Sequence, residues 1–184
     1  MVFGLALSFG ALVLINQPPT DAGRLYLGLL VFGFSFMILV TVWYNYSTIM
    51  AVLPVETRGL IVANIVLLFV VALEPYLLYV LVFYGPTSVT EPTSVLYGLD
   101  LAAMNAILGG FLHILSREEK PLVSAPYLRK MRVTRNFTVA TASVFLLSSL
   151  PVFWSWAWWP GVPSRIVLWI LTIPAGWIVR IRNR

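Results

Sequence analysis

Six long apolar stretches dominate this sequence and determine whether the chain folds in water or in a membrane. They cover residues 1–16, 25–53, 60–84, 95–115, 137–159 and 162–181. A helix needs about 20 residues to cross the roughly 30 Å hydrocarbon core of a membrane, and every stretch except the first reaches that length. The stretches also lack the strict alternation of barrel strands. The sequence therefore predicts an all-α integral membrane protein, a single domain (residues 1–184) with six transmembrane helices.

The low charge of the chain supports this prediction. Charged residues make up 10% of the sequence, and the mean hydropathy is +0.91. A soluble domain has about a quarter of its residues charged. With so few charges, most helix surfaces must face lipid or another apolar helix.

Basic residues are concentrated on one predicted side of the membrane. If the chain starts in the cytoplasm, ten of its twelve Lys and Arg residues lie in loop 54–59, loop 116–136 and the C-terminal tail. The other two, Arg24 and Arg165, lie on the opposite side. Cytoplasmic loops of membrane proteins carry an excess of Lys and Arg. We therefore expect both termini to be cytoplasmic.

The residue inventory argues against catalysis. The chain has no cysteine, and its one histidine, His113, offers a single ligand where a metal site needs several. No nucleophile elbow of the Gly-x-Ser-x-Gly type and no Gly-rich phosphate loop is present. The net charge of +5 follows from the orientation signal and needs no nucleic acid. We expect no enzymatic activity, no metal, no cofactor and no nucleic-acid partner.

Two acidic residues inside apolar stretches are the most informative polar positions. Glu74, followed by Pro75, lies in the third stretch, and Asp100 lies in the fourth. A charge in the hydrocarbon core costs roughly 2.5–3.5 kcal/mol, so each should be paired, protonated or hydrated. One interpretation is a cation-attracting or proton-sensitive site. The other is a hydrogen bond between helices, or exposure at the membrane interface.

Other polar and small residues in the stretches favour helix packing. Amide side chains within membrane helices mostly join neighbouring helices, and a lone histidine does the same. We assign this structural role to Trp43, Asn45, Asn64, Asn105 and His113. Small residues at Ala102, Ala106 and Gly110 recur every four positions, which predicts close approach of a neighbouring helix.

A resemblance to a known family rests on the second and third stretches. They contain Trp43-Tyr44-Asn45-Tyr46, a short turn with Pro54 and Arg58, then Asn64, Leu67-Leu68-Phe69-Val70 and Glu74-Pro75-Tyr76. This pattern resembles the endolysosomal potassium channel family, and more closely its bacterial and archaeal homologues. The resemblance is best over residues 30–80 and is topological beyond residue 95. It implies a location in a prokaryotic cell membrane.

The chain departs from that family in two places. Tyr46 stands where the family usually has histidine. The Arg-x-x-x-Phe-Ser-Asp hallmark that opens the family's first helix is missing, and Met1-Val2-Phe3 is similar to the segment just after it. We expect either that the natural start lies upstream or that this is a divergent member.

The resemblance also implies a function. In the family, the first helix lines the central pore of a tetramer, and large apolar side chains constrict that pore. By position, the constriction residues here are Leu5, Phe9 and Leu12, with Ser8 as a pore hydroxyl. The implied protein is a potassium-leaning cation channel. A non-conducting membrane scaffold or complex subunit is the alternative, and a proton-coupled carrier using Glu74 or Asp100 is a third reading.

Overall fold

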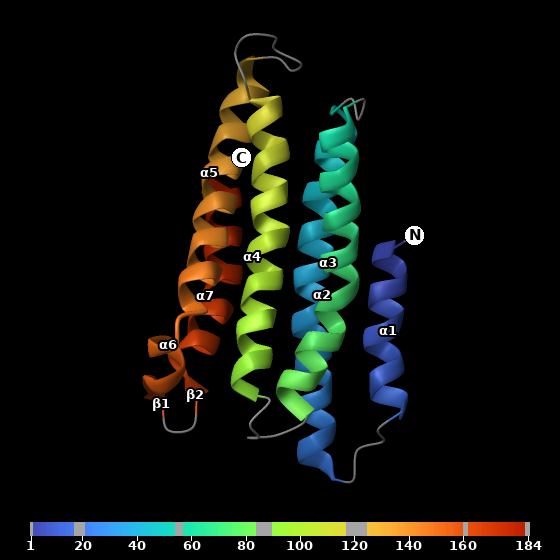
Figure 1. The fold of residues 1–184 in the computed structure, drawn as a ribbon, viewed down its shortest axis with the longest axis vertical. Helices are drawn as coiled ribbons and strands as arrows, with labels where there is room; N and C mark the ends of the chain where they lie inside the picture. Colours follow the sequence, from blue (N-terminus) through green and yellow to red (C-terminus); the bar gives the residue numbers. More distant parts are fainter. Residues whose placement is uncertain are drawn as a thin grey trace.

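The protein is an elongated bundle of antiparallel helices in a computed structural model (Figure 1). The structure describes residues 2–16, 21–53, 57–83, 90–116, 125–159 and 162–182. Its elements in chain order are α1 (Val2–Asn16), α2 (Ala22–Met50), α3 (Arg58–Phe83), α4 (Thr90–Leu115), α5 (Ala125–Ser148), α6 (Val152–Ser155), β1 (Ala157–Trp159), β2 (Val162–Pro163) and α7 (Ser164–Arg182).

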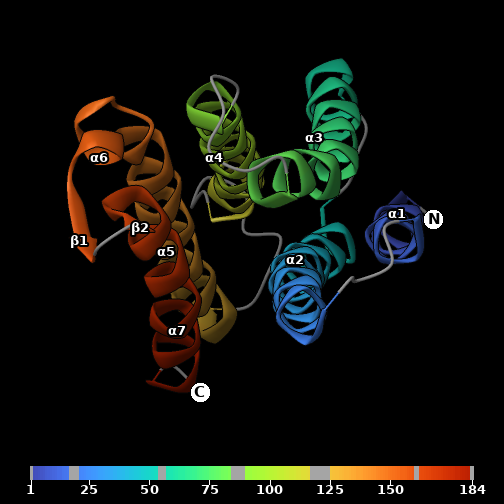
Figure 2. The same cartoon turned by 90° about the horizontal axis from the view of Figure 1, so that it is seen from below.

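Helix α4 lies at the centre of the bundle. It packs against α5 on one side and against α3 and α2 on the other. Helix α1 makes its extensive contacts with α3 and α2. It lies at one edge of the bundle (Figure 2). The opposite edge is formed by α5, α7 and the short elements between them. The two ends of the chain therefore belong to opposite sides of a core built around α4.

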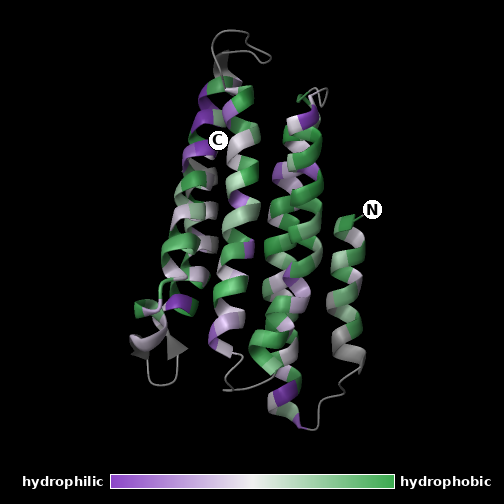
Figure 3. Ribbon diagram, viewed as in Figure 1, coloured by the Kyte–Doolittle hydropathy of each residue, from purple (hydrophilic) through white to green (hydrophobic). Residues whose placement is uncertain are grey.

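Three of the helices, α2, α3 and α4, are long and apolar enough to cross a membrane. Residues of high hydropathy recur along the helices (Figure 3), and many large hydrophobic side chains are exposed as well as buried. An outer surface of this kind is stable only where lipid or another apolar partner replaces water. With three helices that could span a membrane, the structure thus supports the prediction of an all-helical membrane protein.

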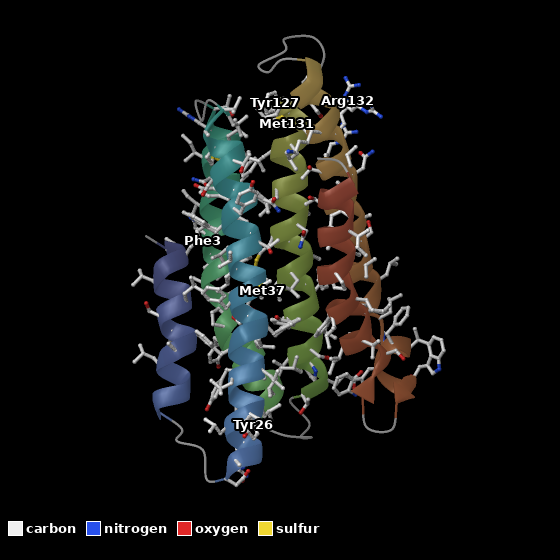
Figure 4. All side chains as sticks on the ribbon, turned by 180° about the vertical axis from the view of Figure 1, so that it is seen from behind. Phe3, Tyr26, Met37, Tyr127, Met131 and Arg132 are labelled. Carbon is white, nitrogen blue, oxygen red and sulfur yellow. The ribbon has the colours of Figure 1, made fainter. Side chains whose placement is uncertain are left out.

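Helix α5 differs from the sequence prediction at both ends. It begins at Ala125 instead of Phe137, and it ends at Ser148 instead of Trp159. The early start has a local cause, because the added residues are mostly good helix formers and Pro126 falls in the first turn, where proline is tolerated. Met131 in this extension is buried, and Figure 4 labels it near the end of the bundle with Tyr127 and Arg132. Four basic residues predicted to be in a loop therefore lie on a helix: Arg129, Lys130, Arg132 and Arg135.

The early end of α5 also has a local cause. The residue before a proline disfavours helical backbone, and Pro151 follows shortly after Ser148. The chain turns there into α6 and then into an antiparallel two-stranded ribbon of β1 and β2. Ser164 closes this segment, since its N–H and its hydroxyl both donate to the carbonyl of Trp156, at 2.9 and 2.6 Å. The short ribbon corrects the expectation of continuous helix to residue 159.

Close packing of α4 depends on glycines other than the one predicted. A Cβ atom at Gly98 would lie 2.7 Å from Ser149 Oγ and 3.3 Å from a ring carbon of Trp169. In the predicted row of small residues, Ala102 is buried, but Ala106 and Gly110 lie on the surface of the subunit. A Cβ atom at Gly110 would have no neighbour within 4 Å. The row therefore does not bring a neighbouring helix of this chain against Gly110.

The glycine contacts generate a stability prediction. We expect Gly98→Ala to destabilise the protein by about 1–3 kcal/mol, because the added methyl group overpacks the contact of α4 with α5 and α7. Gly33→Ala on α2 is the matched control, since a Cβ atom there meets nothing within 4 Å. Thermal unfolding in detergent micelles measures both variants, and equal stability of the two would contradict the prediction.

Candidate functional site

Glu74 is the centre of a buried polar cluster formed by three helices. Its side chain is 0% exposed. Ser35 of α2 donates a hydrogen bond to Glu74 Oε2 at 2.6 Å, and the hydroxyl of Tyr97 on α4 donates to Oε1 at 3.0 Å. Both carboxylate oxygens on α3 are therefore satisfied from neighbouring helices. The geometry matches the interpretation of Glu74 as a hydrogen-bonding link between helices.

Asp100 lies on α4 beside this cluster, and its carboxylate differs from that of Glu74 in its hydrogen bonding. It is 6% exposed, and neither of its carboxylate oxygens has a hydrogen-bond partner among the described residues. It interacts electrostatically with Glu74, and neither carboxyl group has an ion-pair partner in the described part of the chain. The cluster thus combines one carboxyl group whose oxygens are both hydrogen-bonded and one whose oxygens are enclosed without a hydrogen-bond partner among the described residues.

The two carboxyl groups lie at similar depth along their helices. Glu74 is nine residues from the end of α3, and Asp100 is ten residues from the start of α4. At ~1.5 Å per residue these separations are roughly 13 and 15 Å, well inside the helical part of the bundle. Pro75 has no N–H to donate to the carbonyl of Val71, which loses its regular helical partner next to the cluster.

A second buried polar site is organised by Arg165 at the start of α7. The sequence places this residue on the outer side of the membrane, near the start of the predicted helix 162–181, and its side chain is 0% exposed. Its Nε donates to the carbonyl of Ser148 at 2.6 Å, and its Nη2 donates to the carbonyls of Ser149 and Leu150 at 3.1 and 3.0 Å. A cation there is favourable because these carbonyls form the negative end of the dipole of α5.

The two polar sites are connected through aromatic side chains. Arg165 also donates to the hydroxyl of Ser94 on α4. One turn along, Trp169 donates from its indole nitrogen to Ser148 Oγ at 2.8 Å. The Trp169 ring packs on Tyr97, with 5.2 Å between ring centroids, and Tyr97 in turn binds Glu74. The contacts run without a break from α7 through α4 to α3 and α2.

The predicted pore residues share one exposed face of α1. Leu5, Phe9 and Leu12 are 60%, 43% and 50% exposed. Ser8 lies on the same face, and its hydroxyl donates to the carbonyl of Gly4 at 2.8 Å. The opposite face packs inward through Phe3 and Ala6, which are buried, and the Phe3 ring lies 5.6 Å from that of Tyr46.

The remaining predicted polar residues occupy varied environments. Trp43 is exposed, and Asn45 is half-buried. Asn64 is half-buried, and its Oδ1 has no partner in the described ranges. Asn105 donates to the carbonyl of Leu101 at 2.9 Å, a bond within α4. The exposed His113 faces α5, with its Nδ1 3.5 Å from Arg135 Nη1.

Sequence reasoning missed Ser35, Tyr97 and Arg165 as members of these sites. Serine and tyrosine are common in apolar helices, and nothing in the sequence indicates which of them binds Glu74. Arg165 carried a usable signal, since an arginine two residues after Pro163, at the start of an apolar stretch, can reach back to a preceding helix end. Among the described residues, no three His, Asp or Glu side chains are grouped as metal ligands would be.

Comparison with protein-family models, with curated proteins and with solved structures found no match to this chain.

The cluster generates a prediction for Tyr97. We expect Tyr97→Phe to lower the free energy of unfolding by about 0.6–1.7 kcal/mol, the range measured for hydrogen bonds between membrane helices, because one oxygen of Glu74 loses its donor. Tyr76→Phe on α3 is the control, since the Tyr76 side chain is exposed. Denaturant unfolding in micelles compares the two, and equal losses would show that the hydroxyl of Tyr97 does not stabilise Glu74.

The second site generates a prediction for Arg165. Arg165→Gln should cost about 3 kcal/mol, because hydrogen bonds to a charged group are strong and the carbonyls at the end of α5 lose their donors. Arg24→Gln removes the same charge from an exposed pair with Asp21 at 3.8 Å, which contributes about 0–1 kcal/mol. The same unfolding measurement applies, and a cost for Arg165→Gln no larger than that for Arg24→Gln would contradict the assignment.

Proposed function

We propose that this chain is the subunit of a potassium-leaning cation channel in a prokaryotic cell membrane. In this proposal the subunit crosses the membrane six times with both termini in the cytoplasm, and four subunits surround a central pore lined by α1. The observation that carries the proposal is the exposed apolar face of α1, formed by Leu5, Phe9 and Leu12, on a helix at the edge of the subunit. The resemblance of residues 30–80 to the endolysosomal potassium channel family supports it.

The spacing on α1 suits a pore constriction. Residues separated by three, four and seven positions share one face of a helix, so four copies of α1 would present rings of leucine and phenylalanine to the axis. A narrow apolar ring loses its water, and an ion must shed part of its hydration to pass. The constriction therefore acts as a gate.

Ser8 supplies the polar element of the proposed pore. Its hydroxyl hydrogen is directed to the carbonyl of Gly4 in its own helix. A serine hydroxyl has one donor and two acceptor sites, so the lone pairs remain for a cation. A ring of four such oxygens lowers the cost of dehydration more for weakly hydrated K⁺ than for Na⁺.

The buried cluster has a supporting role in the proposal. Helix α3 carries Glu74 and also packs against α1. The bonds of Glu74 to Ser35 and Tyr97 hold α2, α3 and α4 together as the frame that carries the pore helix.

We expect Phe9→Ala and Leu5→Asn to raise cation flux roughly tenfold, which corresponds to about 1.4 kcal/mol removed from the barrier. Each change widens or wets the constriction. Phe69→Ala on α3 removes an aromatic ring that is 62% exposed, against 43% for Phe9, and serves as the control on another helix. Flux is measured in proteoliposomes with K⁺ and Na⁺ gradients.

The oligomeric state is measured on the same preparation by cross-linking and mass determination. A tetramer with flux that responds to Phe9 and Leu5 supports the channel. A monomer contradicts the proposal, and a correctly assembled tetramer without flux favours the non-conducting scaffold.

A further inference from the structure

A shallow hollow of about 510 Å³ lies on the outer surface between α4 and α5. Its apolar lining includes Gly110, Val139 and Ala140, and its polar lining includes His113, Arg135 and Asn136. On α4 the polar residue His113 follows Gly110 in the chain. On α5 the polar residues Arg135 and Asn136 precede Val139 and Ala140. Because the two helices are antiparallel, all the polar lining is at the same end of the hollow (Figure 1).

The polar end is level with the last turn of α4. Arg135 Nη1 donates to Ser116 Oγ at 3.1 Å, directly beyond the end of α4 at Leu115. Arg135 Nε and Nη2 both donate to Asn136 Oδ1, at 3.1 and 2.9 Å. With the contact to His113, these interactions use at most four of the five N–H groups of a guanidinium. The side chain is thus held in place over the hollow with a donor left for a ligand.

The charge around this end is positive. The first twelve residues of α5 contain Arg129, Lys130, Arg132 and Arg135 and no acidic residue. Arg135 has no ion-pair partner among the described residues, while Glu118 and Glu119 lie outside them. Arginine donates charge-assisted hydrogen bonds to phosphate oxygens, and the remaining N–H of Nη2 can make one such bond. A positioned arginine without an ion-pair partner among the described residues, on a basic stretch of α5, fits a phosphate group.

From the other end of the hollow, exposed small and apolar residues continue along both helices. Ala106, one turn before Gly110 on α4, is exposed, as are Ser143 and Leu147 further along α5. This surface suits a hydrocarbon chain, which needs apolar contact and little depth.

We propose that the hollow binds one anionic phospholipid, with its phosphate on Arg135 and an acyl chain along Gly110 and Ala106. A basic site at the interface next to an apolar groove matches the two parts of such a lipid, and anionic lipids are attracted to basic segments at a membrane surface. The site is distinct from the α1 face and from the Glu74 cluster, and it requires no ion conduction.

The test measures lipids retained by purified protein, using native mass spectrometry after addition of phosphatidylglycerol or phosphatidylcholine to the micelles. The native chain should retain phosphatidylglycerol at least fivefold more than phosphatidylcholine. Gly110→Leu fills the hollow without a clash, since a Cβ atom there meets nothing within 4 Å, and it should abolish retention of phosphatidylglycerol. Gly33→Leu makes the same change at another unobstructed glycine, on α2, and should leave retention unchanged.

The charge variants test the phosphate contact. Arg135→Gln should reduce the preference for phosphatidylglycerol at least fivefold, and Arg135→Lys should retain part of it. Lys130→Gln removes the same charge from α5 at a position roughly 140° around the helix from Arg135, and it should have no effect. Circular dichroism and gel filtration confirm that each variant is folded, and Arg135→Lys keeps the test valid if Arg135→Gln does not fold.

Three results would overturn the proposal. Retention that survives both Gly110→Leu and Arg135→Gln would place the lipid elsewhere. Displacement of the lipid by millimolar inorganic phosphate in the buffer would indicate a site for free phosphate rather than for a lipid. A change of oligomeric state in Gly110→Leu with unchanged lipid retention would show that a second copy of the chain covers the hollow.

Discussion

The bundle depends on satisfying buried polar groups within an apolar structure. Glu74 is completely buried, and its two oxygens accept hydrogen bonds from Ser35 on α2 and Tyr97 on α4. In lipid no water is present to replace a lost partner, so each of these bonds restricts how α2, α3 and α4 pack. Helix amphipathicity alone would allow many rotations of these apolar helices. The hydrogen bonds to one carboxylate select among them.

Arg165 imposes the same constraint on the other half of the molecule. Its guanidinium binds three carbonyls at the end of α5 and the hydroxyl of Ser94 on α4, which positions the start of α7 against both helices. Trp169 then joins this site to Tyr97, since the two rings are in contact. The carboxylate and the guanidinium do not touch, yet both act through α4. This arrangement agrees with the many buried residues of α4 and with the close contact that a Cβ atom at Gly98 would make with Ser149 and Trp169.

The functional proposals concern surfaces that this core leaves uncovered. The face of α1 with Leu5, Phe9 and Leu12 is directed away from α2 and α3, and the hollow at Gly110 opens between α4 and α5. One surface fits other copies of the chain around a pore, and the other fits a lipid with a phosphate group. They lie on different helices and can be altered separately. Asp100 differs from both, because it is buried and its carboxylate oxygens have no hydrogen-bond partner among the described residues.

Much of the fold could be predicted from the sequence because hydrophobicity and helix length act locally. The apolar stretches locate α2, α3 and α4, although α4 begins at Thr90 and not at the predicted residue 95, and Glu74 and Asp100 stand out because charges are rare there. The course of α5 was wrong at both ends, since a charged segment can continue a helix when residues such as Met131 pack on a neighbour. The ribbon after α6 was missed because it depends on the bond of Ser164 to Trp156.

The sequence by itself determined that the chain folds in a membrane, that it is helical, and which polar residues lie inside its apolar stretches. These properties follow from composition and local periodicity. Only the tertiary structure decided which partners those residues have. Ser35 and Glu74 are 39 positions apart, and Arg165 and Ser94 are 71 positions apart. Such pairs depend on the rotation and depth at which whole helices pack, which no local pattern encodes. For the same reason only the structure showed that Ala106 and Gly110 line an open surface rather than a contact between helices of this chain.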